Sequence, residues 1–390
     1  MKKIAILSST DYNSYPVGGM MSFIKDSAPE MAKRFELDFW GVDAGAGVDS
    51  FTSGAHTFPV RFFGSVKTGR KIIPNVIRVT WYLWRNRRAL LEAGYDGIYI
   101  HGIPLNMALP RRAGGPKRIN HVHGLNNPFK ALDQQNGFGK RMLHRFYEWM
   151  RRTAVRDSDL ILLAGDQQGL APFSQAYPTS ARLVALPNFC DTETFGPHVA
   201  PLDLAAEGFR DTDRILLYVG RLSKEKDPVL AVRILAALSA QDDAQNPIHL
   251  VMIGGGDLEQ AVADEARALG VQDRLKTLGM QPRATIAQWM RSADALLLTS
   301  HFEGFPVVLA EAAQSGLPMI CPEITGVHDL VLPGETGFVV HSRNAQGFVA
   351  PVQKALAHRA AYGTRARELA AQYTLGRILE RLCQEIADVL

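Results

Sequence analysis

The chain has 390 residues, of which 46% are hydrophobic and 21% charged, and its formal net charge is +4. Its length suits two α/β domains, and its composition is that of a soluble globular protein. Three sparse cysteines and the lack of any long apolar run exclude a disulfide framework and a transmembrane helix, and they favour a reducing cytoplasm.

The net charge hides an asymmetry between the two halves. Residues 1–190 contain 25 Lys and Arg against 14 Asp and Glu, whereas residues 191–390 contain 18 against 25. A basic first half indicates an anionic partner, such as a membrane surface, a lipid diphosphate or a nucleic acid, unless the charge is simply solvated surface.

The chain opens with a pattern that suits a phosphate-binding loop. Residues 2–9 predict a buried strand, and residues 22–35 have helical periodicity. Gly18 and Gly19 lie between them, where backbone N–H groups at a helix start can bind phosphate. Because the G-x-G-x-x-G fingerprint is missing, a dinucleotide-dependent hydride-transfer enzyme is disfavoured.

Residues 60–91 interleave cations with aromatic and aliphatic side chains. The cations are Arg61, Lys67, Arg70, Lys71, Arg78, Arg85, Arg87 and Arg88. The rings are Phe62, Phe63, Trp81, Tyr82 and Trp84. This mixture suits a membrane interface or a nucleic-acid surface, and it also fits a helix whose aromatic residues are core.

A histidine ends one of the next predicted strands. Residues 97–101 and 119–123 predict strands, and the second finishes at His123. Since side chains alternate along a strand, His121 points to the same side, and spacing alone does not separate the two. Further on, Asp157 and Asp159 form a D-x-D pattern, which holds a metal in other transferases. Here it precedes a strand, and we interpret it as structural.

The second half of the chain carries charged and glycine-rich loops after its strands. A polar stretch at 192–213 predicts a linker, and residues 214–219 predict a strong strand that leads to Arg221 and Lys226. The next predicted strand ends in three glycines that include Gly255. Further along the chain, Met280 follows a short strand-like stretch at residues 276–278.

The stretch from Thr299 to Glu311 organises the rest. An apolar strand precedes it, and residues 307–315 have helical periodicity, so the turn between them lies at the carboxyl end of a strand, where open α/β sheets bind ligands. The turn contains Glu303, Gly304 and Phe305, and Pro306 suits the first turn of the helix, where a missing N–H costs nothing. A helix start favours an anion such as a diphosphate, and the two carboxylates can accept hydrogen bonds from hydroxyls on either side of it.

The spacing of Glu303 and Glu311 resembles the signature of the retaining glycosyltransferases of family 4, and the Gly-Arg-Leu-Ser-Lys-Glu-Lys-Asp run at 220–227 resembles another of their segments. The resemblance implies the GT-B fold, an α/β architecture in which two doubly wound Rossmann-like domains face a cleft. It implies an acceptor-binding domain at 1–190, a linker at 191–213 and a donor-binding domain at 214–372. The terminal helix at 373–390 is expected to pack back on the first domain.

The resemblance also implies roles for single residues. Glu303 would hold the donor sugar, Arg221 and Lys226 the diphosphate, and His123 would lie against the sugar. Binding of the rest of the donor would fall to Gly18, Gly19, Gly255, Met280, Gly304, Phe305, Pro306 and Glu311, the last of these on the ribose. No metal and no cofactor are expected, because the nucleotide-sugar is itself a substrate and the cations can stabilise the leaving diphosphate.

The implied function is transfer of a sugar, with retention, from a nucleotide-sugar to a lipid-linked or glycan acceptor in cell-surface polysaccharide biosynthesis. UDP-sugar is the expected donor. The location would be the cytoplasm, with peripheral contact through residues 60–91 on the inner face of the plasma membrane, and no nucleic-acid partner. Two alternatives stay open: a nucleotide-sugar epimerase of the same fold, and a non-catalytic protein that binds membrane or nucleic acid.

Overall fold

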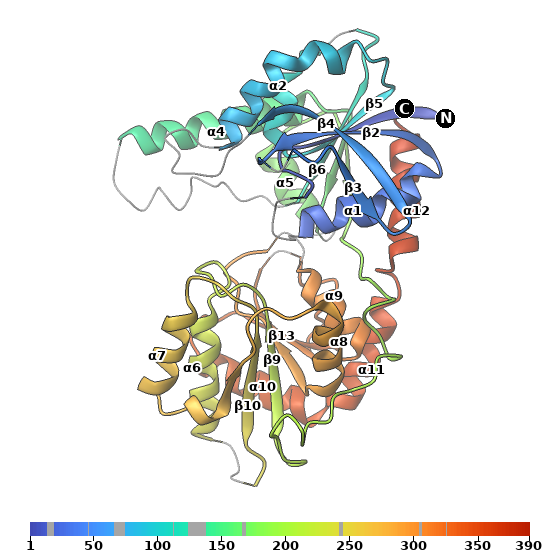
Figure 1. The fold of residues 1–390 in the computed structure, drawn as a ribbon. Helices are drawn as coiled ribbons and strands as arrows, with labels where there is room; N and C mark the ends of the chain where they lie inside the picture. Colours follow the sequence, from blue (N-terminus) through green and yellow to red (C-terminus); the bar gives the residue numbers. More distant parts are fainter. Residues whose placement is uncertain are drawn as a thin grey trace. The chain divides into compact units, whose positions relative to one another are not determined.

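The computed structural model describes residues 1–13, 19–45, 47–65, 75–111, 113–123, 138–165, 169–241, 245–303, 306–324 and 326–390. Its chain folds into two compact units (Figure 1). Unit 1 comprises Met1–Pro187 and Ile378–Leu390, and unit 2 comprises Asn188–Arg377.

An eight-stranded sheet forms the centre of unit 1, in the order β3-β4-β2-β1-β5-β6-β7-β8. The strands are β1 (Lys2–Ser8), β2 (Phe35–Asp43), β3 (Ser50–Ser53), β4 (His56–Ser65), β5 (Gly97–His101), β6 (Lys117–Val122), β7 (Leu160–Leu163) and β8 (Arg182–Ala185). All neighbours pair in parallel except β3 and β4. The β1 run from Ile4 to Leu7 is continuously apolar and fully buried, because helices cover both faces of a parallel sheet.

The helices of unit 1 connect these strands. They are α1 (Gly19–Ala32), α2 (Asn75–Leu91), the 3-10 helix η1 (Ile103–Ala108), α4 (Phe138–Arg156) and α5 (Leu170–Ala176). Both α2 and α4 contact η1. Most of α12 (Leu375–Ala387) also belongs to unit 1, where Arg182 forms ion pairs of 2.7 Å with Glu385 and 3.1 Å with Asp388.

Unit 2 contains a six-stranded parallel sheet in the order β11-β10-β9-β12-β13-β14. The strands are β9 (Arg214–Val219), β10 (Ile248–Ile253), β11 (Leu275–Thr277), β12 (Ala295–Leu297), β13 (Met319–Pro322) and β14 (Gly337–Val340). The helices are α6 (Pro228–Ser239), α7 (Glu259–Ala268), η3 (Gln272–Arg274), α8 (Arg283–Ser292), α9 (Val307–Ser315), α10 (Gln346–Ala357) and α11 (Arg359–Ala370).

Alternation along β9 divides the core of unit 2 into two layers. Ile215 and Leu217 face a cluster with α8, α9 and α11, whereas Leu216 and Tyr218 face a cluster with α6, α7 and α10. Both faces of this sheet are therefore covered, which explains why its strands lack the polar alternation of a half-exposed sheet.

Residues 191–213, which the sequence predicts as a linker, belong to unit 2. Phe195 and Phe209 are buried in its core, and Leu202 donates a backbone hydrogen bond of 2.7 Å to Ser292. The linker prediction rested on the polar residues of the stretch and did not take account of its two buried phenylalanines.

In each sheet the order of the strands reverses once. From β1 the chain moves outward through β2 and β4 and then returns to β5 on the other side; from β9 it moves through β10 and β11 and then returns to β12. Such reversals create a crevice at the carboxyl ends of the two central strands, where doubly wound sheets bind their ligands.

Candidate active site

The reversal point of unit 2 gathers the charged residues that the sequence singles out. Arg221 follows β9, and the segment that follows β12 runs through Thr299 and Ser300 to Glu303. The backbone N–H of His301 donates to the carbonyl of Glu225 at 2.8 Å, so the loops after β9 and β12 are directly joined.

An ion pair lies at the centre of this edge. Lys226 Nζ is 2.5 Å from Glu303 Oε1, and both side chains are largely buried, 22% and 12% exposed. Ser300 Oγ donates to the same carboxylate oxygen at 2.7 Å. The structure thus brings together two residues that the family resemblance assigns to different parts of one ligand, the diphosphate and the sugar.

Arg343 ties the surrounding loops to one another. Its guanidinium donates to the carbonyl oxygens of Ser300 at 2.9 Å and Thr299 at 2.8 Å, and it pairs with Asp227 at 3.0 Å. Sequence analysis missed this residue, because it lies beyond β14, more than 110 positions from Asp227, and no motif marks it.

Asp227 itself adopts a left-handed backbone conformation, with φ of 48° and ψ of 56°. Its side chain accepts from the Leu230 N–H at 3.3 Å and so caps α6. Thr299 Oγ1 contacts the carbonyl oxygens of Lys226 and Asp227 at 2.8 and 2.9 Å. A non-glycine residue in this conformation persists only where its surroundings hold it, and such positions concentrate at functional sites.

Arg221 differs from Lys226 in its exposure. Its side chain is 70% exposed and pairs with Glu225 four residues later. An exposed pair of this kind contributes little to stability, so its guanidinium is available to exchange partners when an anion binds.

Glycines bring the loops after β9, β10 and β11 close together. Gly254 has a φ of 139°, and a Cβ on it would lie 1.9 Å from the carbonyl oxygen of Gly220. Its N–H donates to Gly279 at 2.8 Å, while a Cβ on Gly255 would meet Met280 Cγ at 3.5 Å. Met280 is 83% exposed, so its thioether is free to lie against a planar ligand.

A cavity of about 340 Å³ opens beside these loops. Its lining extends from the glycine loops to the groove between α7 and β11, and is formed by Leu222, Gly254, Glu259, Ala263, Ala266, Arg267, Gln272, Leu275, Thr277 and Gly279.

Glu311 is buried in α9 beside two charged groups. It is 8% exposed, and its carboxylate lies 3.2 Å from Arg283, whose guanidinium is also 3.5 Å from Asp191. Burial raises the pKa of Glu311 to about 7, which Arg283 opposes and Asp191 reinforces. Burial alone would raise the pKa of Asp191. The net effect is a lowered pKa, because the carboxylate accepts hydrogen bonds from Thr194 and Glu193 and lies beside the charge of Arg283. Sequence analysis missed Arg283, which begins α8.

The other residues predicted to bind the donor lie at helix starts or outside the described residues. Pro306 is the N-cap of α9, one position earlier than a first-turn residue, and its carbonyl accepts from the Leu309 N–H at 2.9 Å. Gly19 begins α1. Gly18, Gly304 and Phe305 lie outside the described residues.

Three histidines gather at the corresponding edge of unit 1. His101 ends β5 opposite His121 in β6, and His123 follows that strand by one residue. His101 Nδ1 and His123 Nε2 share a hydrogen bond of 2.7 Å, and Tyr99 Oη lies 2.7 Å from His121 Nδ1. Burial lowers the pKa of all three, for His123 to about 3, so the rings are neutral at physiological pH.

Sequence analysis considered His121 and His123 but missed His101. The available signal was that one predicted strand finishes at His101 and the next contains His121 and His123. Parallel register then places His101 beside His121.

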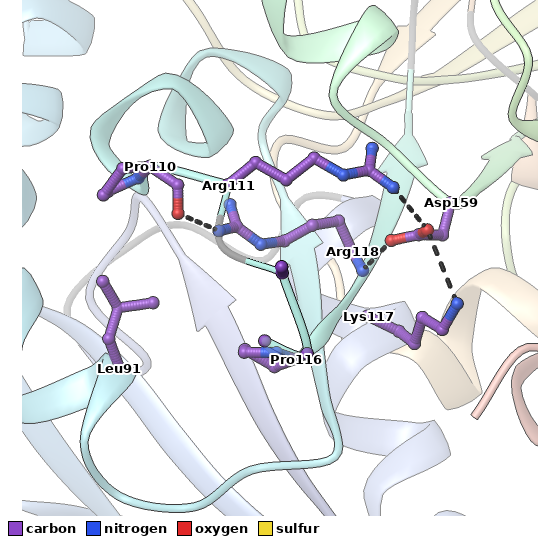
Figure 2. Close-up of a pocket in the computed structure, with 10 residues that line it drawn as sticks. Leu91, Pro110, Arg111, Pro116, Lys117, Arg118 and Asp159 are labelled. Atoms are coloured by element: carbon purple, nitrogen blue, oxygen red, sulfur yellow. Dashed lines mark hydrogen bonds and ion pairs between the residues drawn. The ribbon is translucent and has the colours of Figure 1, made fainter.

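A second pocket, of about 290 Å³, lies at the opposite edge of unit 1 (Figure 2). Asp159 precedes β7 there and binds Arg111 at 2.8 Å, Lys117 at 3.8 Å and the backbone N–H of Arg118 at 2.9 Å. The oxygens of this carboxylate are engaged by cations and backbone, and the structural interpretation of the D-x-D pattern stays a prediction.

Comparison with known proteins identifies the family of unit 2. Residues 201–372 match the family model described as Glycosyl transferases group 1. This part of the chain belongs to the group 1 glycosyltransferases. The match covers the unit 2 site residues described above except Asp191 and its partners Glu193 and Thr194, so the Lys226–Glu303 pair and the Glu311–Arg283 pair lie in a glycosyltransferase domain.

A curated relative shows the reach of the similarity. The chain is 28% identical over 244 residues to a D-inositol 3-phosphate glycosyltransferase of Nocardiopsis dassonvillei, which is 60% of this chain and 56% of that protein. The chain spans about half the length of the curated relatives it matches.

Solved structures extend the similarity to the whole chain at the level of fold. The lipopolysaccharide outer core galactosyltransferase WaaB matches with a TM-score of 0.71 at 20% identity over 100% of both chains. Anabaena Alr3699/HepE in complex with UDP matches with a TM-score of 0.69 at 18% identity over 99% of this chain and 100% of that one. The predicted GT-B fold, with two Rossmann-like α/β units, is confirmed. Among the described residues, no helix is long and apolar enough to cross a membrane.

Proposed function

We propose that this protein is a retaining glycosyltransferase that moves a sugar from a UDP-sugar to a lipid-linked or glycan acceptor. The observation that carries the proposal is the buried Lys226–Glu303 pair at the reversal point of a group 1 glycosyltransferase domain. A carboxylate that can hold sugar hydroxyls and a cation that can hold phosphate oxygens lie 2.5 Å apart, the proximity that a sugar diphosphate requires.

The charge that develops on the leaving diphosphate would be stabilised by Lys226 and Arg221. Lysine supplies a compact charge, and arginine can bind two phosphate oxygens at once. Both are paired with carboxylates in the structure, so binding a diphosphate would exchange one anionic partner for another rather than create an uncompensated charge. The start of α9 would add its backbone dipole, and no metal is needed in this scheme.

The nucleoside would lie across Glu311 and the glycine loops. Glu311 is the buried acceptor for ribose hydroxyls, held in position by Arg283. The base would occupy the loops at Gly255 and Met280, beside the cavity that Gly254 and Gly279 help to line. We choose UDP because a solved protein of the same fold binds it.

Transfer with retention would proceed by attack on the same face of the sugar from which the diphosphate leaves. The leaving phosphate would accept the proton of the attacking hydroxyl, while Glu303 holds the sugar by its hydroxyl groups. Holding the donor sugar and the attacking hydroxyl in this geometry would accelerate transfer by proximity, and the cations would stabilise the leaving group electrostatically.

The acceptor is proposed to be lipid-linked because unit 1 exposes aromatic rings beside cations. On α2, Trp81 and Trp84 are each 51% exposed, with Arg85 and Arg87 over their rings at 5.8 and 4.4 Å. The buried face of α2 is formed by other residues, Val79, Leu83 and Leu90. Core packing therefore accounts for part of the helix but not for its tryptophans.

The helix α4 presents similar rings. Trp149 is 54% exposed and stacks on Phe146, which is 43% exposed. Exposed tryptophans with arginines suit the headgroup layer of an anionic membrane. A solved protein of the same fold acts on lipopolysaccharide, a lipid-linked glycan, according to its name.

The test is nucleotide release from UDP-, GDP- and ADP-sugars, with and without a lipid-linked acceptor fraction. We expect release from a UDP-sugar that the lipid fraction stimulates, and a loss of about 100-fold or more in Lys226→Ala. The matched control is Lys224→Ala, an exposed lysine two positions away, which should keep the wild-type rate.

Release from no donor, together with no binding of UDP, would reject the proposal. Conversion of a donor to its epimer without acceptor would instead assign the chain to the epimerases of this fold. Membrane contact has its own measurement: Trp81→Ala/Trp84→Ala should bind vesicles with 30% anionic lipid at least about 10-fold more weakly than wild type, and equal binding would remove these rings from the interface.

A further inference from the structure

We propose that His101, His121 and His123 form a binding site for one divalent transition-metal cation of the zinc class. Each of the three side chains offers a ring nitrogen, and these atoms all lie within 4.8 Å of one another. Imidazole nitrogen is a preferred ligand of Zn²⁺, Cu²⁺, Ni²⁺ and Fe²⁺, and three histidines with an open fourth position are a known ligand set for zinc.

The fold itself creates this arrangement. His101 and His121 are direct neighbours in the parallel pairing of β5 and β6, and His123 projects to the same side two residues after His121. The ring centroids are 4.1 Å apart for His121 and His123, 5.1 Å for His101 and His123, and 5.5 Å for His101 and His121. The site therefore rests on two adjacent strands, which are more rigid supports than loops.

The three rings also leave polar atoms unsatisfied. Within the described part of the chain, His101 Nε2, His121 Nε2 and His123 Nδ1 are buried and have no hydrogen-bond partner. A cation bound at His121 Nε2 would give that atom the partner it lacks. His101 Nε2 and His123 Nδ1 are the outer nitrogens of the two rings whose facing nitrogens, His101 Nδ1 and His123 Nε2, would bind the cation.

Contacts around the rings resemble those that orient metal ligands. Tyr99 Oη holds His121 Nδ1 at 2.7 Å, which leaves Nε2 of that ring to face a metal. Phe23 packs against the His121 ring in a T-shaped arrangement, with centroids 4.8 Å apart and an interplanar angle of 88°. His123 is partly exposed, so a water molecule or another ligand can reach the fourth position.

Proton balance sets one condition on binding. A single proton lies between His101 Nδ1 and His123 Nε2, which are 2.7 Å apart. A cation that takes this proton's place needs nitrogens about 3.3 Å apart, given bonds of about 2.0–2.1 Å in tetrahedral geometry. The pair must open by roughly 0.6 Å. The displaced proton moves to the outer nitrogen of its own ring, so the three neutral rings keep three protons and none is released.

The experiment is titration of the full chain with Co²⁺ and Zn²⁺. An exposed group elsewhere, in which His328 and His341 approach Glu323, could also bind metal, so all measurements use a His328→Ala/His341→Ala background. We expect one Co²⁺ per chain with the intense visible d–d absorption of a four-coordinate site, displaced by one Zn²⁺. The Zn²⁺ dissociation constant is then obtained by competition with a chromophoric chelator.

His121→Phe and His123→Ala on this background should each weaken Zn²⁺ binding by at least about 100-fold, because a directly bound ligand matters more than an outer partner. Melting curves of the metal-free variants test whether each still folds, and His123→Ala, at the partly exposed position, is the safer of the two. The absence of one-to-one binding, or equal affinity in a folded variant and its background, would overturn the proposal. This result does not depend on the proposed transfer reaction, because it is measured without any sugar donor.

Discussion

The two units have the same kind of sheet but opposite chemistry at the edge where each sheet reverses. In unit 2 the edge is built from opposite charges that neutralise one another, as in Lys226 with Glu303 and Arg283 with Glu311. In unit 1 the corresponding edge holds three neutral imidazoles with unpaired nitrogens. One topology thus supports two kinds of site, and the side chains at the strand ends determine which ligand each can bind.

The difference also predicts how each edge responds to a ligand. Paired charges are already compensated, so an incoming diphosphate must displace a carboxylate from its cation. Unpaired imidazoles have nothing to displace except one shared proton. Substitutions in the charge pairs of unit 2 distinguish whether these pairs serve the reaction, the burial of the site or the fold of its loops.

The largest effect is expected for Glu303→Gln. This change keeps an acceptor for the Ser300 hydroxyl but leaves Lys226 without its carboxylate. We expect the transfer rate to fall by about 100- to 1,000-fold, since an acceptor for the sugar is lost in the transition state. UDP should bind as tightly as to wild type or more tightly, because Lys226 no longer has a competing anion. Steady-state kinetics and calorimetric UDP binding provide the two measurements.

Glu225→Gln is the matched control for that experiment. Glu225 is paired with the exposed Arg221, so its loss should change the rate by no more than a few fold. If Glu303→Gln also weakened UDP binding in proportion to the rate, the pair would serve binding of the nucleotide and not the transfer step.

The sequence predicts the site of unit 2 better than that of unit 1. Glu303, Glu311, Arg221 and Lys226 lie in two short segments at fixed spacing, and local patterns of strand, turn and helix were enough to place them. By contrast, Arg343 reaches the same loops from beyond β14, and a pairing over more than 110 residues leaves no local signal.

The histidines of unit 1 illustrate a different limit. His101 meets His121 only because β5 and β6 are neighbours in register, and strand order is a property of the whole sheet. Residues 191–213 illustrate a third limit. Two buried phenylalanines in a polar stretch create no periodic pattern, so the sequence does not distinguish a packed segment from a linker there. The short apolar runs predicted buried parallel strands and so an α/β fold, whereas the GT-B architecture followed from the family resemblance.

Burial of a carboxylate in unit 2 should appear as a pH dependence of stability. Glu311 has a folded-state pKa of about 7, raised by burial above its ordinary value near 4.5. Between these values the folded protein holds a proton that the unfolded chain has lost, so the free energy of unfolding falls as pH rises. Glu311→Gln carries no such charge, and it should gain about 3 kcal/mol relative to wild type between pH 4.5 and 7.5.

Hydrogen exchange of the α9 amides in the full chain measures this difference. The exposed Glu335, which pairs with Arg365, supplies the control, because Glu335→Gln should leave the pH dependence of wild type unchanged. A constant difference between Glu311→Gln and wild type over the whole pH range would show that Glu311 is ionised throughout and that Arg283 compensates its burial.

The smallest effect is expected where a charge pair serves the fold of the loops. Arg343→Lys keeps the positive charge but loses the planar fork that reaches Thr299, Ser300 and Asp227 together. We expect a loss of about 1–2 kcal/mol in stability and faster exchange of the amides after β12, whereas the exposed Arg377→Lys should change neither. If the transfer rate of Arg343→Lys then fell with UDP affinity unchanged, the left-handed turn at Asp227 would be the feature that holds Lys226 and Glu303 in position for the reaction. A rate equal to wild type would instead confine Arg343 to stability.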